Sequence, residues 1–159
     1  MSAKPIEEPV MPALHLSARF RWIAVAFTLF VATLCQLAPA SAGIVAKVDI
    51  ARQRMTVIVD GNVEAVWAIS TARRGYYTPR GIYRPKLLKR MHYSKKYDNS
   101  PMPYSVFFKG GYAVHGTYSI KQLGRAASHG CIRLAPSHAA ALYQLIRHRG
   151  MSDTRVVIG

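Results

Sequence analysis

Residues 55–70 read MTVIVDGNVEAVWAIS, which is two apolar, β-branched runs separated by a turn. Asp60 and Gly61 stand between the two runs. An Asp-Gly pair in this setting is the strongest short-range signal of a β-hairpin, because these residues suit a tight turn. The stretch therefore predicts a hairpin with strands over 55–59 and 63–70.

Further strand-like segments lie on both sides of this hairpin. They are rich in apolar and β-branched residues, and we expect strands over 44–51, 82–83, 104–108, 112–114 and 154–158. Gly110 and Gly111 separate two of these segments and predict a second hairpin. Residues 85–103, in contrast, are basic, rich in Tyr, Lys and Pro, and show no period. We expect them to form a long surface loop, either a functional lid or a disordered segment.

One helix is expected near the C-terminus. Pro136 suits a first helical position, and Ala139, Leu142 and Ile146 recur at helical spacing before Gly150, which is a natural stop. The pattern as a whole predicts a mainly β domain, a small β-sandwich or barrel-like fold with one short C-terminal helix.

The N-terminal segment has the pattern of a secretory signal peptide. Two arginines precede a run of 16 uncharged residues, Trp22 to Leu37, and Ala40-Ser41-Ala42 follows as a small-x-small cleavage site. The apolar run is short for a bilayer span, which needs roughly 20 residues. We therefore expect residues 1–42 to be a signal peptide and 43–159 to be an exported domain, in the periplasm or cell wall.

Two alternatives remain for this N-terminal segment. It could be retained as an uncleaved membrane anchor, or it could carry a lipid on Cys35. The lipoprotein pattern is weakened by Leu34, because a small residue is usual before a lipidated cysteine.

The net charge is strongly positive, at +15, from 22 lysines and arginines against seven aspartates and glutamates. Such a chain favours anionic partners: nucleic acid, a membrane surface or an acidic envelope polymer. An exported protein rarely meets nucleic acid, and the sequence shows no pattern of stacking aromatics or of a phosphate-binding loop. We therefore expect the partner to be an anionic cell-wall surface and not nucleic acid.

Two short motifs carry the reactive side chains, VHGT at 114–117 and SHGCIRL at 128–134. The thiol of Cys131 becomes a nucleophile when a nearby base or cation favours the thiolate. His129 would share a strand face with Cys131, because residues two apart on a strand point the same way. His115 could reach the sulfur through a hairpin or loop.

Other interpretations of these motifs stay open at this point. Gly130 could aim backbone N–H groups at one point and so form an oxyanion hole. A lone cysteine is more often a small buried hydrophobic residue. His115, His129 and Cys131 could also supply three ligands to zinc, although neither motif has an aspartate or glutamate within ten residues.

Taken together, these residues resemble the catalytic domain of the L,D-transpeptidases, the YkuD domain. The family signature is a His-Gly pair followed by a Ser/Thr-His-Gly-Cys segment, which here are His115-Gly116-Thr117 and Ser128-His129-Gly130-Cys131. Further matches to the family are Thr78-Pro79-x-Gly81-x-Tyr83, Met102-Pro103-Tyr104 and Gly110-Gly111. The resemblance covers nearly all of residues 44–158.

The resemblance implies a role for each matching residue. Cys131 is the nucleophile, and His115 is the general base and acid, its ring oriented by the backbone carbonyl of Gly116. The remaining roles are support of the oxyanion by His129 and Gly130 and binding of the substrate by Met102, Tyr104, Ser128 and Arg133. Many family members have asparagine in place of Arg133. An arginine there suits a free carboxylate of the substrate, although a plain surface arginine is the alternative.

The implied activity is that of an exported enzyme acting on the stem peptides of peptidoglycan. A thioester would form at the third stem residue with release of D-Ala, and an amine on a second stem or on a wall-attached protein would resolve it. No metal or organic cofactor is expected. The alternatives are a hydrolase or carboxypeptidase of the same bonds and a non-catalytic wall-binding module.

Overall fold

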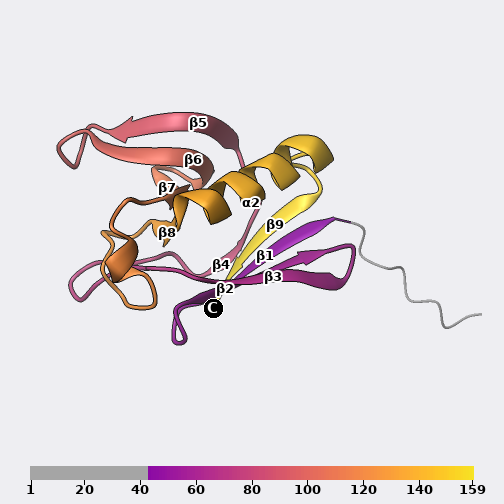
Figure 1. Ribbon diagram of the computed structural model, residues 1–159, viewed down its shortest axis with the longest axis horizontal. Coiled ribbons are helices and arrows are strands. Elements are labelled where there is room, and N and C mark those ends of the chain that lie inside the picture. Colours follow the sequence, from indigo (N-terminus) through magenta and orange to yellow (C-terminus); the bar gives the residue numbers. More distant parts are fainter. Residues whose placement is uncertain (1–42) are drawn as a thin grey trace, which may run out of the picture. The chain divides into compact units, whose positions relative to one another are not determined.

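The computed structural model describes residues 43–159, which form two β-sheets and a helix (Figure 1). The predictions for residues 1–42, a signal peptide or an anchor, lie outside these described residues. No helix in residues 43–159 has the length and hydropathy of a membrane span. The two sheets and the single long helix of this part confirm the mainly β fold expected from the sequence.

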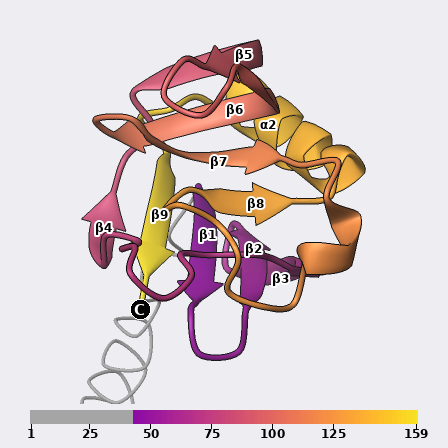
Figure 2. The ribbon, with the colours of Figure 1, turned by 90° about the vertical axis from the view of Figure 1, so that its left-hand side faces the viewer.

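The first sheet has the strand order β3-β2-β1-β9-β4. Its strands are β1 (Ile44–Asp49), β2 (Arg54–Val59), β3 (Asn62–Ala68), β4 (Gly81–Tyr83) and β9 (Thr154–Ile158). The C-terminal strand β9 runs parallel to β1 and antiparallel to β4, so the first and last strands of the described chain lie side by side in this sheet (Figure 2).

The expected hairpin at the start of the domain is present as β2 and β3. Val59 pairs with Asn62, which leaves Asp60 and Gly61 as a two-residue loop. Both loop residues have positive φ, at 49° and 86°. This is the backbone that a tight hairpin turn requires and that an Asp-Gly pair adopts at low cost.

The second sheet has the order β5-β6-β7-β8. Its strands are β5 (Leu87–Ser94), β6 (Ser100–Lys109), β7 (Tyr112–Gly116) and β8 (Ile132–Leu134), with a 3₁₀ turn, η2 (Ile120–Gln122), between the last two. β7 and β8 are parallel neighbours, so the motif at 114–117 and the motif at 128–134 lie next to each other in this sheet.

The prediction of a long loop over 85–103 is wrong, because these residues form β5 and the first part of β6. The sequence did not indicate a strand here because Pro101 and Pro103 lack a backbone N–H and cannot donate a hydrogen bond to a neighbouring strand. In the structure both prolines pair with β5, and the pairing of β6 with β7 runs only from Val106 to Lys109, so neither proline takes part in the β7 ladder. Prolines are tolerated in such a position.

The helix α2 (Pro136–Arg149) lies where the sequence predicts it and contacts both sheets, through β6, β7 and β1. It begins with a proline and ends at Gly150, whose φ is 101°. Its buried residues join a core of side chains from both sheets, among them Val48, Met55, Phe108, Val114, Ile132 and Val156. The helix therefore packs against both sheets and completes the core between them (Figure 1).

Candidate active site

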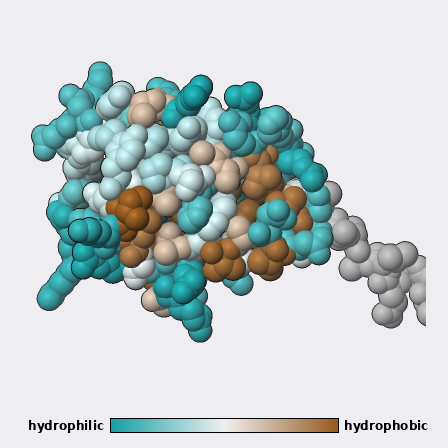
Figure 3. Space-filling view, in the orientation of Figure 1, coloured by the Kyte–Doolittle hydropathy of each residue, from teal (hydrophilic) through white to brown (hydrophobic). Residues whose placement is uncertain are grey.

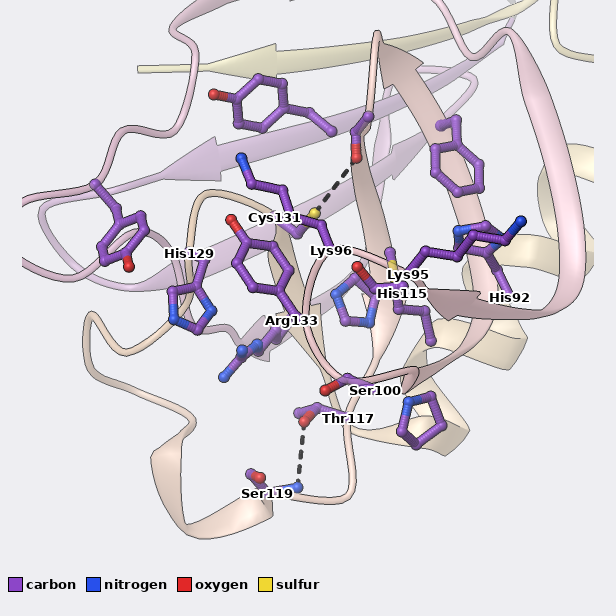
Figure 4. A pocket seen from close by; sticks show the side chains of 18 of the residues that line it. His92, Lys95, Lys96, Ser100, His115, Thr117, Ser119, His129, Cys131 and Arg133 are labelled. Carbon is purple, nitrogen blue, oxygen red and sulfur yellow. Dashed lines mark hydrogen bonds between the residues drawn. The ribbon is translucent and has the colours of Figure 1, made fainter.

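A cavity of about 910 Å³ opens over β7 and β8 (Figure 4). Its walls come from the segment at 75–77, the β5–β6 hairpin, the segment at 117–119 and the turn that precedes β8. The side chains of His115, Cys131 and Arg133 enter it together with Met102. The cavity thus collects residues from four separate parts of the chain.

The parallel pairing of β7 and β8 brings the two catalytic motifs together. Val114 pairs with Ile132, and His115 pairs with Arg133. Ile132 and Leu134 are fully buried in the core, so the alternating residues Cys131 and Arg133 face the cavity. The sequence argument left open whether a hairpin or a loop brings His115 toward Cys131, and in the structure a parallel ladder brings both residues to one cavity.

His115 is fixed by burial and by one hydrogen bond. Its side chain is 6% exposed, and its Nδ1 lies 2.7 Å from the carbonyl oxygen of Gly116. Because a carbonyl can only accept, Nδ1 must carry the proton, and Nε2 is left as the nitrogen that can accept one. The orienting contact expected from the family resemblance is therefore present.

Burial lowers the pKa of His115 to about 4, and the nearby Arg133 guanidinium adds to this effect. The Gly116 carbonyl acts in the opposite direction but is the weaker influence. His115 is thus a neutral imidazole near neutral pH, which is the state that a general base needs.

Gly116 occupies a site with no room for a side chain. A Cβ there would lie 3.0 Å from Cγ of Pro103 and 3.1 Å from the Cα of Pro136. Two rigid prolines therefore hold the backbone whose carbonyl fixes the His115 ring.

Cys131 rests as a thiol. Burial raises its pKa, an effect larger than the opposing ones of the Ala113 backbone N–H and the Arg133 guanidinium. Its Sγ donates to the carbonyl oxygen of Gly111 at 3.8 Å. The sequence argument looked for a group that favours the thiolate, whereas burial in the structure favours the neutral thiol, in a cavity that also holds the neutral imidazole of His115.

The turn before Cys131 is held by its own hydrogen bonds. The Ser128 hydroxyl donates to the Cys131 carbonyl oxygen at 2.6 Å and accepts from the Gly130 N–H at 2.9 Å. The Thr78 hydroxyl donates to the Gly130 carbonyl oxygen at 2.9 Å. Gly130 has a φ of 127°, and a Cβ there would lie 2.7 Å from the Tyr77 carbonyl oxygen.

These bonds correct two of the expected roles. The Gly130 N–H is already used by Ser128, so it is not a free oxyanion donor. Ser128 is 1% exposed and is not among the residues that line the cavity. Its hydroxyl supports the turn, and direct substrate binding by Ser128 is not what the structure shows.

His129 also differs from the expectation. Residues 129–131 are bends and not strand, so His129 and Cys131 do not share a strand face. The His129 ring stacks on Tyr97 with centroids 4.4 Å apart and meets the edge of the Tyr76 ring at 4.6 Å. Its contacts are therefore with the cavity walls.

The remaining substrate-binding predictions divide. Met102 and Arg133 line the cavity. Tyr104 does not line it, which corrects that prediction: its backbone has a φ of 54°, and its ring packs on Tyr143 of α2 with centroids 5.8 Å apart. The positive φ turns this side chain out of the regular alternation of β6 and into the core.

The cavity is lined by cations without acidic partners. Arg133, Lys95 and Lys96 line it, and no aspartate or glutamate does. The Arg133 guanidinium donates to Oε1 of Gln122 at 3.2 Å, which is a neutral partner. Within residues 43–159 the ion pairs lie elsewhere, at Asp49 and Asp60. Hydrophilic residues also cover much of the face drawn in Figure 3.

Sequence reasoning missed several lining residues. These are the residues of the 75–77 segment, of the β5–β6 hairpin and of the 117–119 segment: Tyr76, His92, Lys95, Lys96, Tyr97 and Tyr118. The dense Tyr, Lys and His content of 92–97 was a usable signal, because aromatic and cationic side chains are common in sites that bind anionic ligands. In the described part of the chain, no group of three His, Cys, Asp or Glu side chains is arranged to hold a metal ion.

Comparison with known proteins agrees with this geometry. A solved L,D-transpeptidase from Stackebrandtia nassauensis is 27% identical, with a TM-score of 0.65, over 78% of this chain and 58% of that chain. One from Xylanimonas cellulosilytica is 28% identical, with a TM-score of 0.62, over 77% and 63%. One from Mycobacterium smegmatis is 23% identical, with a TM-score of 0.66, over 74% and 59%, and shows the shared fold.

The chain spans about three fifths of the length of these solved structures. No match was found among curated proteins. The family model described as the L,D-transpeptidase catalytic domain, YkuD, matches residues 43–158, which is nearly the whole described domain. This chain therefore belongs to the L,D-transpeptidase catalytic domain family.

Proposed function

We propose that the protein is an exported cysteine L,D-transpeptidase that acts on peptidoglycan stem peptides. The observation that carries the proposal is the buried His115, whose Nδ1 is bound to the Gly116 carbonyl while its ring enters the same cavity as the Cys131 thiol. This arrangement supplies a base of fixed tautomer to a single nucleophile.

In the first half of the reaction, His115 Nε2 accepts the thiol proton as Cys131 Sγ attacks the carbonyl between the third stem residue and the terminal D-Ala. The C–N bond then breaks, and His115 returns the proton to the leaving D-Ala amine. A thioester between Cys131 and the third stem residue remains. A neutral imidazole and a neutral thiol are the reactants that this step requires.

In the second half, the amine of another stem or of a wall-attached protein attacks the thioester. Its proton passes to His115 and then to the Cys131 sulfur, so the enzyme returns to its resting state with a new amide bond formed. Arg133 supports a free carboxylate of the stem, because its guanidinium has only a neutral partner in the cavity.

Hydrolysis is the second candidate function, since water in place of the amine gives a carboxypeptidase. Muropeptides rich in tetrapeptide stems, incubated with the protein, should yield new dimers with a 3→3 cross-link, measured by mass spectrometry. Trimmed stems without dimers would reject the transferase function in favour of the hydrolase function. No product of either kind would favour a wall-binding module.

The acyl-enzyme is tested with a β-lactam. A solved L,D-transpeptidase 3 from Mycobacterium tuberculosis carries a faropenem-derived adduct. Faropenem or a carbapenem should therefore add its mass once to this protein, and Cys131→Ser should abolish the adduct. An adduct that persists in Cys131→Ser would reject Cys131 as the nucleophile.

Export to the periplasm or cell wall is part of the same proposal. It rests on the sequence of residues 1–42, with cleavage after Ala42. N-terminal sequencing of the exported protein should begin at Gly43. Retention of Met1 in a membrane fraction would indicate an anchor, and a lipid on Cys35 would indicate a lipoprotein.

A further inference from the structure

Three aromatic rings from distant parts of the chain contact one another on the wall of the cavity that holds Cys131. His129 lies between Tyr97 and Tyr76: it is parallel to the first, with an angle of 11° between the rings, and nearly perpendicular to the second, at 76°. Offset stacking and edge-to-face contact are the two favourable geometries of aromatic pairs. His129 is therefore the central member of a three-ring stack.

Two cations extend this stack. The guanidinium carbon of Arg73 lies 4.9 Å from the Tyr76 ring centroid, and Nζ of Lys96 lies 5.6 Å from that of Tyr97. Both distances are within the range of a cation–π interaction. We call these five residues, Arg73, Tyr76, His129, Tyr97 and Lys96, the ring column.

The ring column joins three segments that surround Cys131. Arg73 and Tyr76 come from the segment after β3, His129 from the turn before β8, and Lys96 and Tyr97 from the tip of the β5–β6 hairpin. All three rings line the cavity. The ring column thus forms a part of the cavity wall to which three separate segments contribute.

The hairpin tip has few other attachments. Its hydrogen bonds, from Tyr97 N–H to Ser94 and from Ser100 N–H to the Tyr97 carbonyl, stay within the tip. Asp98 and Asn99 have positive φ, at 48° and 51°. The ladder to β7 begins only beyond it, at Val106. Ring contacts therefore connect the tip to the catalytic turn.

The ring column also places two cations at the cavity. Lys95 and Lys96 directly precede Tyr97 at the tip, and both line the cavity together with Arg133 of β8 (Figure 4). With no carboxylate lining the cavity, the partners that suit these lysines are the carboxylates of an acidic peptide. The position of the tip thus decides where these two cations lie in the cavity.

We propose that His129 is a positioning residue that docks the β5–β6 hairpin, through the ring column, so that Lys95 and Lys96 bind a carboxylate-bearing acyl donor. The donor class rests on the proposed function, whereas the docking role does not. His129 acts through its ring face and not as a proton carrier. Partial burial and the neighbouring Arg73, Arg133 and Lys96 lower its pKa, so the ring is uncharged near neutral pH.

The test compares His129→Phe with His129→Ala in the full chain. Phenylalanine keeps a stacking ring and removes both imidazole nitrogens, whereas alanine removes the ring. We expect His129→Ala and Tyr97→Ala each to raise KM for a tetrapeptide stem about tenfold, the size expected from a lost ring contact, with kcat changed much less. His129→Phe should stay within about twofold of the wild type, because its ring can still stack.

Two further measurements isolate the ring column. The double variant His129→Ala/Tyr97→Ala should be no worse than either single variant, because both remove the same contact. Tyr93→Ala is the matched control: it removes a tyrosine from the same hairpin that is 55% exposed and does not line the cavity, and it should leave KM unchanged. A kcat loss in His129→Phe equal to that in His129→Ala would overturn the proposal in favour of a catalytic imidazole.

Alkylation of Cys131 by iodoacetamide separates this proposal from the proposed function, because it needs no stem peptide. Undocking should expose the thiol and raise the alkylation rate about tenfold in both alanine variants but not in His129→Phe. Faster alkylation without turnover of stems in any variant would support the docking role and reject the proposed reaction. An unchanged alkylation rate in the alanine variants would overturn the docking role.

Discussion

The two histidines of the cavity are held in opposite ways. His115, at the end of β7, is 6% exposed and bound to a backbone carbonyl that two prolines keep in place. His129, in the turn before β8, is held by the rings of Tyr76 and Tyr97 on the cavity wall. A buried hydrogen bond fixes a tautomer and a direction, while ring contacts can separate and re-form. This difference agrees with the two roles that we propose, proton transfer for His115 and docking of the hairpin for His129.

The largest effect that tests this difference is the loss of the base. His115→Ala should lower the transfer rate by about 10²–10⁴, the usual contribution of a general base. His129→Ala should lose about tenfold in kcat/KM, as a lost ring contact does. Steady-state rates with circular dichroism as a control for folding decide between them. Equal losses, or a larger loss in His129→Ala, would remove the distinction between the two regions.

The burial of His115 should also appear in the acid stability of the protein. The pKa of His115 is about 4 in the fold, against 6.5 for an unperturbed histidine. Between these values the unfolded chain binds the proton and the folded chain does not, so acidification favours unfolding. Stability due to this group is complete above pH 6.5 and decreases by about 3 kcal/mol as the pH falls to about 4.

Urea unfolding at a series of pH values measures this linkage. His115→Gln should flatten the stability curve between pH 6.5 and 4, while His148→Gln on the exposed face of α2 is the control for the loss of a histidine. A curve that keeps its slope in His115→Gln would show that His115 is not buried as a neutral ring.

The Gly116 carbonyl that orients His115 can be displaced by adding a side chain to Gly116. Gly116→Ala would place a Cβ 3.1 Å from the Cα of Pro136 and 3.2 Å from the Pro103 carbonyl oxygen, which are backbone atoms and cannot yield. We expect a loss of about 1–3 kcal/mol in the free energy of unfolding, as for overpacked cores, together with a lower kcat. Gly111→Ala, with no atom within 4 Å of its Cβ, is the control for stability. A stable, fully active Gly116→Ala would show that the ring is oriented by other means.

Much of the fold could be predicted from local sequence patterns, because a turn or a helix is determined largely by residues that are close in the sequence. The Asp60-Gly61 turn and the helix from Pro136 each depend on neighbours in the sequence. The β5 strand and the start of β6 could not be predicted, because a strand can contain Pro101 and Pro103 only where β7 does not pair with it. That is a tertiary fact, and local propensity does not contain it.

The site shows the same division. Cys131, His115 and the Gly116 carbonyl could be predicted because the family signature specifies them together. The environments of His129, Tyr104 and Ser128 could not be predicted, because each depends on a contact across the fold or on an unusual backbone angle. Likewise the neutral state of the Cys131 thiol follows from burial, which a motif does not reveal.

The smallest expected effect is that of Ser128→Ala, which tests whether the turn before β8 acts separately from the ring column. The Ser128 hydroxyl bonds to both the Gly130 N–H and the Cys131 carbonyl, so the backbone of the turn is tied independently of the His129 ring. Ser128→Ala should lower the free energy of unfolding by about 1 kcal/mol, the usual net value of a hydrogen bond, with KM little changed. Ser128→Thr keeps the hydroxyl and should recover part of the loss. The expected behaviour of His129→Ala is the reverse, with KM raised and stability nearly unchanged. If Ser128→Ala raised KM as His129→Ala does, the turn and the hairpin would move as one unit. The hairpin could then not undock without displacing Cys131.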